Sequence, residues 1–219
     1  MIDISRFKAV IFDMDGVLID SEPLWKIAME EVFVSIGCPL TRKDFQKTVG
    51  LRLDEVIEYW YANTGWDNTS PKEVENRIVQ RMIELLKENG EPLSGVVDTL
   101  KHLKSKNFKI GLATSSYEVL INTVLDTLLI RDYFDFTHSA EKESYGKPHP
   151  AVYLSVAEKF NIHPKDCLVI EDSLNGIISG KAARMSVVCI PEKSHSPEPK
   201  LVLADYHFED MSLFLDHIK

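Results

Sequence analysis

Three short apolar runs in the sequence each end at a pair of polar residues that could do chemistry. The pairs are Asp13 with Asp15, Thr114 with Ser115, and Glu171 with Asp172. In an open α/β sheet, ligands bind beyond the carboxyl ends of the strands, which is where such pairs would gather. We therefore expect the three pairs to form one site.

Asp13 and Asp15 stand two residues apart, and Gly16 after them allows the backbone to turn sharply away. A carboxylate can attack phosphorus and form an acyl phosphate, which divides one difficult transfer into two easier steps. We predict that Asp13 is this nucleophile. A second carboxyl group can protonate the leaving oxygen and later accept a proton from the attacking water, and we expect this of Asp15. A turn at a strand end would explain one of these aspartates better than both.

An attack by Asp13 on a phosphate group requires a cation, because the two anions repel each other. The surroundings are rich in oxygen and poor in Cys and His, which favours Mg²⁺. We expect a side-chain oxygen of Asp13, the backbone carbonyl of Asp15 and the carboxylate of Asp172 to hold the ion together with waters. Glu171 is expected to orient a water or to join these ligands.

Thr114, Ser115 and Lys147 are the residues expected to contact the phosphate group. Thr114 and Ser115 end a strand whose next helix begins almost at once, so their hydroxyl and N–H groups can converge on phosphoryl oxygens. Plain helix capping is the alternative for these two residues. Lys147 lies in a turn that two prolines stiffen, and we expect its ammonium group to neutralise both the phosphate and Asp13.

The elements that must position these residues are alternating strands and helices. Apolar runs predict strands at residues 8–12, 108–113, 167–170 and 186–190, and a weaker one at 133–137. Residues with helical spacing lie between these runs. This alternation predicts parallel βαβ units and therefore an α/β fold with a doubly wound parallel sheet.

One segment, from about residue 21 to about residue 91, breaks the alternation because its apolar residues follow helical spacing only. Residues typical of helix ends agree with this: Ser21, Pro23, Gly37, Ser70 and Pro71. We predict a core formed by residues 1–19 and 92–219, with a small helical domain inserted at residues 20–91. We call this insert the cap.

The chain of 219 residues has 34 acidic and 25 basic residues, for a formal net charge of −9. No run of Lys or Arg is long enough to follow a polyphosphate backbone, so we expect no nucleic-acid partner. The three cysteines are far apart, which fits reduced thiols in a cytoplasm. No signal-peptide pattern and no stretch of about 18 apolar residues is present. We expect a cytoplasmic monomer that does not bind membranes.

Taken in order, these clusters resemble the four motifs of the haloacid dehalogenase superfamily of phosphotransferases. Residues 12–21 look like its first motif, Thr114 its second, Lys147-Pro148 its third, and Glu171-Asp172-Ser173 with Gly176 its fourth. An insert directly after the first motif is similar to the small helical cap of the β-phosphoglucomutase-like branch. The resemblance implies a Mg²⁺-dependent phosphatase whose partner is a small phosphomonoester.

Within that branch, further segments look most like the bacterial hexitol phosphatases and 2-deoxyglucose-6-phosphate phosphatases. These segments are residues 21–25, 50–52, 59–62 and 181–185. This resemblance implies hydrolysis of a sugar or polyol phosphate through an aspartyl-phosphate on Asp13.

Two departures from the mutases of the branch favour hydrolysis. Such a mutase has a histidine in its first cap helix where this chain has Trp25, and a Lys-Asn pair where this chain has Tyr117-Glu118. The chain would thus lack a group that restrains the general acid and a cation that holds a second phosphate. A β-phosphoglucomutase-type mutase and a catalytically silent phosphosugar-binding protein are the alternatives.

Two cap residues are candidates for contact with the substrate. Arg52 follows Gly50 in a predicted turn between helices, where it could contact the sugar or help to close the site. A solvated arginine at a helix start fits the same pattern. Trp25 could form one wall of the pocket, although large aromatic residues more often pack one domain against another.

Overall fold

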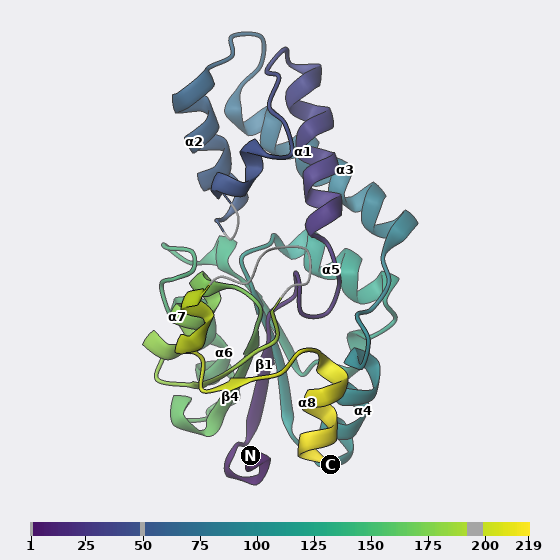
Figure 1. Cartoon of the computed structure of the whole chain (residues 1–219), viewed down its shortest axis with the longest axis vertical. Helices are drawn as coiled ribbons and strands as arrows, with labels where there is room; N and C mark the ends of the chain where they lie inside the picture. The colour runs from purple at the N-terminus through teal and green to yellow at the C-terminus, as the bar shows by residue number, and fades with distance from the viewer. Residues whose placement is uncertain (1, 49–50, 192–198) are drawn as a thin grey trace.

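The computed structural model describes residues 2–48, 51–191 and 199–219, and six of its segments form one sheet (Figure 1). The strands are β1 (Ala9–Phe12), β2 (Lys109–Thr114), β3 (Phe136–Ser139), β4 (Cys167–Glu171), β5 (Ser186–Cys189) and β6 (Tyr206–His207). Their order is β3-β2-β1-β4-β5-β6, and each neighbouring pair is parallel. The predicted doubly wound parallel sheet is confirmed.

The sheet differs from the sequence prediction at its two edges. The weak run at residues 133–137 lies partly in a 3-10 turn, Arg131–Tyr133, and β3 begins only at Phe136. At the other edge, β6 has only the two residues Tyr206–His207 and was not predicted. Two residues are too few to show the alternation that identifies a strand in a sequence.

Helices cover both faces of the sheet. On one face lie α4 (Val96–Ser105), α5 (Glu118–Thr127) and α8 (Met211–Ile218), and on the other lie α6 (Ala151–Phe160) and α7 (Leu174–Ala182). Along β1, Val10 and Phe12 join the first apolar cluster while Ala9 and Ile11 join the second. The strands are thus buried on both faces, which explains why they appear in the sequence as unbroken apolar runs.

The cap stands beyond the carboxyl ends of the strands, in the upper part of Figure 1. Its helices are α1 (Glu22–Ser35), a 3-10 helix (Asp44–Thr48), α2 (Leu53–Thr64) and α3 (Pro71–Asn89). α1 and α2 both pack on α3. Gly37, with a φ of 78°, follows α1, and Ser70 Oγ accepts the N–H of Glu73 at the start of α3. The inserted helical segment is as predicted, and the boundaries at residues 20 and 91 stay a prediction.

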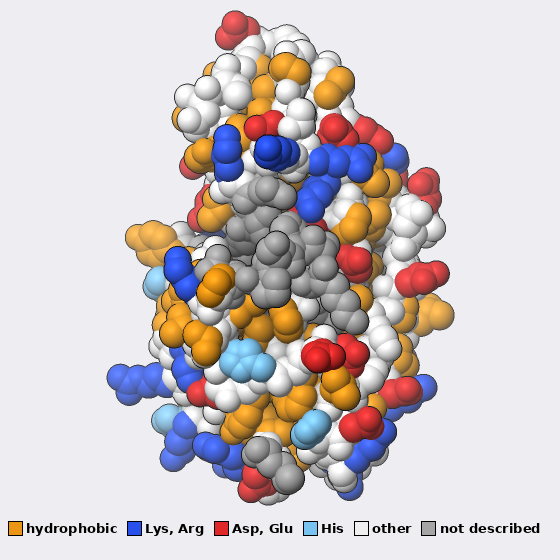
Figure 2. Space-filling view, in the orientation of Figure 1, with side chains coloured by type: hydrophobic (Ala, Val, Ile, Leu, Met, Phe, Trp, Pro, Cys, Tyr) orange, Lys and Arg blue, Asp and Glu red, His pale blue; other side chains and the backbone are white. Residues whose placement is uncertain are grey.

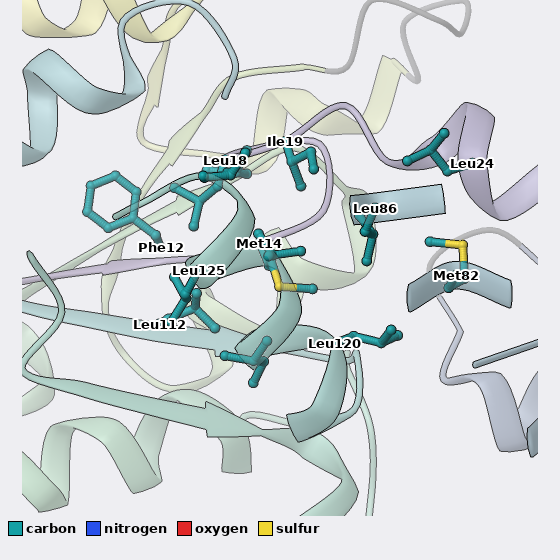
Figure 3. Packing of buried hydrophobic residues seen from close by; sticks show 14 of the residues in the cluster. Phe12, Met14, Leu18, Ile19, Leu24, Met82, Leu86, Leu112, Leu120 and Leu125 are labelled. Carbon is teal, nitrogen blue, oxygen red and sulfur yellow. The ribbon is translucent and has the colours of Figure 1, made fainter. Parts of the chain in front are cut away.

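The chain enters and leaves the cap at one place. Ile19 and Pro92 face each other in an isolated antiparallel bridge, and Leu93 donates its N–H to Leu18 O at 3.0 Å. Close by, α3 packs on α5. Figure 3 shows Leu86 of α3 near Ile19, within an apolar cluster that runs without a break from the sheet into the cap.

The surface carries both signs of charge. On the face shown in Figure 2, Lys and Arg side chains lie in both parts of the molecule, with Asp and Glu side chains among them. No helix within the described ranges is long and apolar enough to cross a membrane.

Candidate active site

The predicted site residues gather where β1 and β4 lie side by side and end. Asp13 directly follows β1, and its N–H donates to Ile170 O at 3.0 Å, which carries the ladder of hydrogen bonds one step past the strand. Glu171 is the last residue of β4, and Asp172 follows it. From β1 the chain proceeds outward through β2 and β3 on one side of this point, and from β4 it proceeds outward through β5 and β6 on the other. Doubly wound sheets bind ligands at the point where the strand order reverses in this way.

Lys147 joins two of these carboxylates in the interior. Its Nζ lies 2.7 Å from Glu171 Oε1 and 2.9 Å from Asp13 Oδ1, and it donates to the carbonyl oxygen of Ala113 at 3.1 Å. The contact with Glu171 is a hydrogen bond, whereas the contact with Asp13 has the geometry of an ion pair only. The side chain of Lys147 is 3% exposed. The predicted neighbourhood of Lys147 and Asp13 is therefore present.

The protonation of this cluster follows from burial and from the sharing of one cation. Burial alone would lower the pKa of Lys147, but the charges of Asp13 and Glu171 raise it above its ordinary value. Burial raises the pKa of Asp13 to about 7, Lys147 opposes this rise, and the carboxylates of Glu171 and Asp15 add to it. Lys147 is thus shared between two carboxylates, and its charge only partly offsets the effect of burial on Asp13.

Glu171 is fully buried and fully hydrogen-bonded. Its Oε1 accepts from Lys147 and from the hydroxyl of Tyr153, each at 2.7 Å. Its Oε2 accepts from the N–H of Asp172 and from both the N–H and the hydroxyl of Ser173. A Cβ atom on Gly176 would overlap the carboxylate of Glu171, so only glycine fits there. These five donors occupy both oxygens and give Glu171 the geometry of a residue that holds Lys147.

Asp15 lies between core and cap. Its Oδ2 accepts from the hydroxyl of Ser116 at 2.7 Å, and its Oδ1 accepts from the hydroxyl of Ser21 and from the indole N–H of Trp25 at 3.2 Å. Ser21 stands at the N-cap position of α1, but its hydroxyl binds Asp15 and does not cap the helix. The prediction that the chain has lost the restraint on its general acid is wrong, because Trp25 holds Asp15 directly.

The end of β2 supplies hydroxyl and N–H groups to the same place. Thr114 is buried, and its Oγ1 accepts the N–H of Ser116 at 3.1 Å. Ser115 lines the same cavity as Thr114. Helix α5 begins four residues after Thr114, at Glu118. Thr114 and Ser115 thus lie beside Asp13 and Lys147, as the sequence predicted, and their role toward phosphate stays a prediction.

An oxygen-rich cluster fits a hard cation. Carboxylate oxygens of Asp13, Glu171 and Asp172 lie within 4.8 Å of one another. Asp13 Oδ1 is buried and accepts no hydrogen bond among the described residues. A Cβ atom on Gly16, whose φ is 72°, would overlap the carboxylate of Asp172, so glycine lets that side chain approach the loop after β1. Donors of this kind suit Mg²⁺.

A cavity between the core and the cap opens onto these groups. The cap contributes Ser21, Glu22, Trp25, Lys26, Met29, Phe45, Thr48, Leu51, Leu53 and Val56, and the core contributes Asp13, Asp15, Gly16, Thr114, Ser115, Ser116, Tyr117, Lys147, Asp172 and Ser173. Trp25 is part of this wall, as predicted. The cap side is mostly apolar, and the core side is mostly polar.

Arg52 does not line this cavity, so the prediction that it contacts the sugar has no support in the structure. Its Nη1 donates to the carbonyl oxygens of Ala140 and Glu143, each at 3.2 Å, and its Nη2 donates to Asp54 at 2.8 Å. Arg52 therefore ties the start of α2 to the core loop that leads to Lys147. Gly50, the other residue of the predicted turn, lies outside the described residues.

Sequence reasoning missed three residues of the site. Ser116 and Ser21 bind Asp15, and Tyr153 binds Glu171. Ser116 continues the run Thr114-Ser115 and could have been included for that reason. The partners of Ser116 and Tyr153 lie 101 and 18 residues away, and no local pattern signals such contacts.

The fold and the site define a family of hydrolases. Residues 10–190 match the family model described as haloacid dehalogenase-like hydrolase. The chain therefore belongs to the haloacid dehalogenase-like hydrolase family.

Individual relatives narrow this class. The chain is 42% identical over 205 residues to hexitol phosphatase B of Escherichia coli (strain K12), covering 93% of this chain and 92% of that protein. It is 36% identical over 180 residues to a phosphorylated carbohydrates phosphatase of Thermotoga maritima, covering 80% and 81%. A solved β-phosphoglucomutase from Clostridium difficile has a TM-score of 0.82 and 28% identity, covering 94% and 92%.

These similarities confirm the predicted superfamily and its β-phosphoglucomutase-like branch. The expected enzyme class, a phosphoric monoester hydrolase, is confirmed as well, since relatives across the family are named as phosphatases.

Proposed function

We propose that the chain is a Mg²⁺-dependent phosphatase of a small sugar or polyol phosphate, such as 2-deoxyglucose 6-phosphate or a hexitol phosphate. The observation that carries this proposal is the meeting of Asp13, Lys147 and Asp172 at the ends of β1 and β4, under a cavity that the cap closes. The similarity to hexitol phosphatase B supports the substrate class.

In the proposed reaction, Asp13 attacks phosphorus and carries the phosphoryl group as an aspartyl-phosphate until water releases it. Asp15 protonates the leaving oxygen and then accepts a proton from the attacking water, while Ser21, Trp25 and Ser116 hold its carboxylate in place. Lys147 binds a phosphoryl oxygen, as do the hydroxyl and N–H groups of Thr114 and Ser115.

The residues that would hold Mg²⁺ are Asp13, Asp172 and the backbone carbonyl of Asp15, with Glu171 keeping Lys147 in position. The bound ion would offset the repulsion between the phosphate group and the carboxylate of Asp13. The same positive charge would lower the pKa of Asp13 from its raised value and so favour the ionised nucleophile near neutral pH.

A phosphosugar mutase is the second candidate, and the hydrogen bond from Trp25 to Asp15 favours it, because that bond supplies a restraint on the general acid. Tyr117 argues against it. The Tyr117 hydroxyl donates to Glu75 at 2.8 Å, in the place where a mutase of this branch is expected to have a lysine. A phenol bonded to a carboxylate offers no positive charge for a second phosphate, so hydrolysis is the preferred function.

Phosphate release from a panel of sugar and polyol phosphates, with Mg²⁺ and after chelation, tests the proposal. We expect release with Mg²⁺ only, and a loss on the order of 10⁴ or more in D13N. The fold of D13N should persist, because Lys147 keeps its hydrogen bond to Glu171. D98N, which changes an exposed aspartate of α4 outside the cavity, is the matched control.

Binding of Mg²⁺ to D172N, measured by calorimetry, separates the metal site from turnover, and we expect at least tenfold weaker binding than in the unchanged protein. Turnover retained in D13N would refute the aspartyl-phosphate. Inactivity on the whole panel with Mg²⁺ present would leave a phosphosugar-binding protein, and formation of a sugar phosphate isomer without free phosphate would establish the mutase.

A further inference from the structure

The described cap side of the cavity contains an ion pair in a mostly apolar wall. Lys26 Nζ lies 2.9 Å from Glu22 Oε1, one turn apart at the start of α1, and the two side chains are 19% and 17% exposed. Both line the cavity that opens onto Asp13. Their wall neighbours include Met29, Leu53 and Val56. A sugar or polyol chain that fills this space therefore meets a mostly apolar surface on which Lys26 and Glu22 are the charged groups among the described cap residues.

The other side-chain hydrogen-bond donors on the described cap wall already have partners, and so does Tyr117 on the core side. The Thr48 hydroxyl donates to Phe45 O at 3.1 Å, and the Tyr117 hydroxyl donates to Glu75. Trp25 and Ser21 both donate to Asp15. An ammonium group has three N–H donors, and the pair with Glu22 uses one of those of Lys26. Among the described cap residues that line the cavity, Lys26 is thus the one with side-chain donors to offer a ligand.

We propose that Lys26 binds a hydroxyl oxygen on the carbon chain of the substrate, and that Glu22 positions its ammonium group. This inference rests on the proposed function. It makes Lys26 a specificity-determining residue that distinguishes hydroxylated monophosphates from plain alkyl phosphates. Buried polar groups of this kind discriminate strongly, because a ligand that lacks the matching hydroxyl leaves them unpaired.

The net charge of the pair decides which kind of ligand group Lys26 binds. An unpaired lysine in this wall would attract a second phosphate or a carboxylate. Glu22 offsets that charge at 2.9 Å and would repel a second anion. The pair therefore favours a neutral hydroxyl and disfavours a bisphosphate, which agrees with hydrolysis of monophosphates.

Three substrates of equal carbon number test the proposal: a hexitol 6-phosphate, hexyl phosphate and a hexitol 1,6-bisphosphate. We measure kcat/KM for each with the unchanged enzyme and with K26M. The expected loss in K26M is about 10- to 100-fold on the hexitol monophosphate and less than about threefold on hexyl phosphate. K87M, the same change at an exposed cap position outside the cavity, should leave all three values unchanged.

Two further variants keep the test sharp. K26Q retains an N–H donor without the charge and should recover part of the lost activity on the hexitol monophosphate. E22Q leaves Lys26 charged but unpaired, so the ratio of kcat/KM for the bisphosphate to that for the monophosphate should rise about tenfold. Thermal melting of each variant checks that it is folded.

Equal losses in K26M on hexitol and hexyl phosphates would overturn the proposal, because they would mean a general effect on the site. A larger loss on the bisphosphate would overturn it too, since Lys26 would then bind the second anion. If the unchanged enzyme releases phosphate neither from these three nor from any compound of the sugar and polyol phosphate panel, the proposed function itself fails, and that result is distinct from both others.

Discussion

Asp15 receives hydrogen bonds from three side chains, one of which comes from the core and two from the first residues of the cap. In the proposed reaction Asp15 is the general acid, which must stay close to the leaving oxygen, and these bonds would hold its carboxylate there. The structure differs from the sequence prediction at Trp25. Because the mutases of the branch have a histidine at this position, we expected the tryptophan to make no contact with Asp15. The indole N–H of Trp25 nevertheless donates to the carboxylate of Asp15.

Replacing Trp25 with Phe keeps the apolar wall but removes that donor. We expect kcat to fall about 2- to 10-fold with little change in KM, because one neutral hydrogen bond is lost while Ser21 and Ser116 still hold Asp15. Steady-state kinetics on a monophosphate substrate check this. W60F is the matched control, since the Trp60 N–H is buried without a partner among the described residues. An equal fall of kcat in W60F would contradict the assigned contact.

At the scale of single residues, the sequence was a good guide where chemistry follows a strand end. Asp13, Thr114 and Glu171 were all located by that rule, and the structure brings them together. The position of Arg52 was not predictable, because its partners are backbone carbonyls 88 and 91 residues away. Every residue has a backbone carbonyl group, so the residue types in a sequence do not indicate which of these groups will accept a hydrogen bond.

At the scale of elements, an aspartate fastens each edge strand to its neighbour. Asp135, just before β3, donates its N–H to Ile110 O at 2.8 Å and accepts the N–H of Ile110 on its side chain at 2.9 Å. Asp205, just before β6, makes the same exchange with Val187, at 2.9 and 2.8 Å. These contacts explain how two edge strands with a weak or absent signal in the sequence still join the sheet.

The contacts of Asp135 predict a dependence of stability on pH. Burial would raise the pKa of Asp135, but the N–H of Ile110 and the charges of Lys109 and Lys104 lower it below its ordinary 3.8. A lowered pKa means that the stabilisation is complete above about 3.8 and is lost as pH falls through the folded value. D135N should therefore be less stable than the unchanged protein at neutral pH, by about 0.5–1 kcal/mol.

Thermal melting between pH 7 and pH 3 measures this effect. We expect D135N to melt about 1–4 °C lower at pH 7, and the difference to shrink as pH falls below about 3.8. D132N, an exposed aspartate in the preceding turn, should show no such difference. A gap between D135N and the unchanged protein that stays constant across this range would exclude the ionised carboxylate as its cause.

At the scale of the whole molecule, Arg52 connects the start of α2 in the cap to the core. Its side chain is 14% exposed, and its two bonds to carbonyl oxygens cross from the start of α2 to the loop before Lys147. Both bonds would have to break if the cap moved away from the core. This supports the expectation that Arg52 helps to close the site, in place of the expected contact with the sugar.

R52M removes both bonds and should shift the balance toward an open cap by about 2 kcal/mol, or roughly 30-fold. We expect a larger radius of gyration in small-angle X-ray scattering and a raised KM. R77M, which removes an exposed pair within α3, is the control and should change neither. An unchanged radius in R52M would show that the apolar packing of α3 on α5 alone holds the cap.

The bridge between Ile19 and Pro92 has a consequence for how such proteins diversify. Because the chain leaves the core and returns to it at adjacent positions, the cap closes a loop whose ends already meet, and its length adds little entropic cost. None of the six strands of the sheet lies between those two positions. In evolutionary terms, one exchange of the inserted segment could change which sugar the cavity accepts. The carboxylates at the strand ends would stay in place during such an exchange.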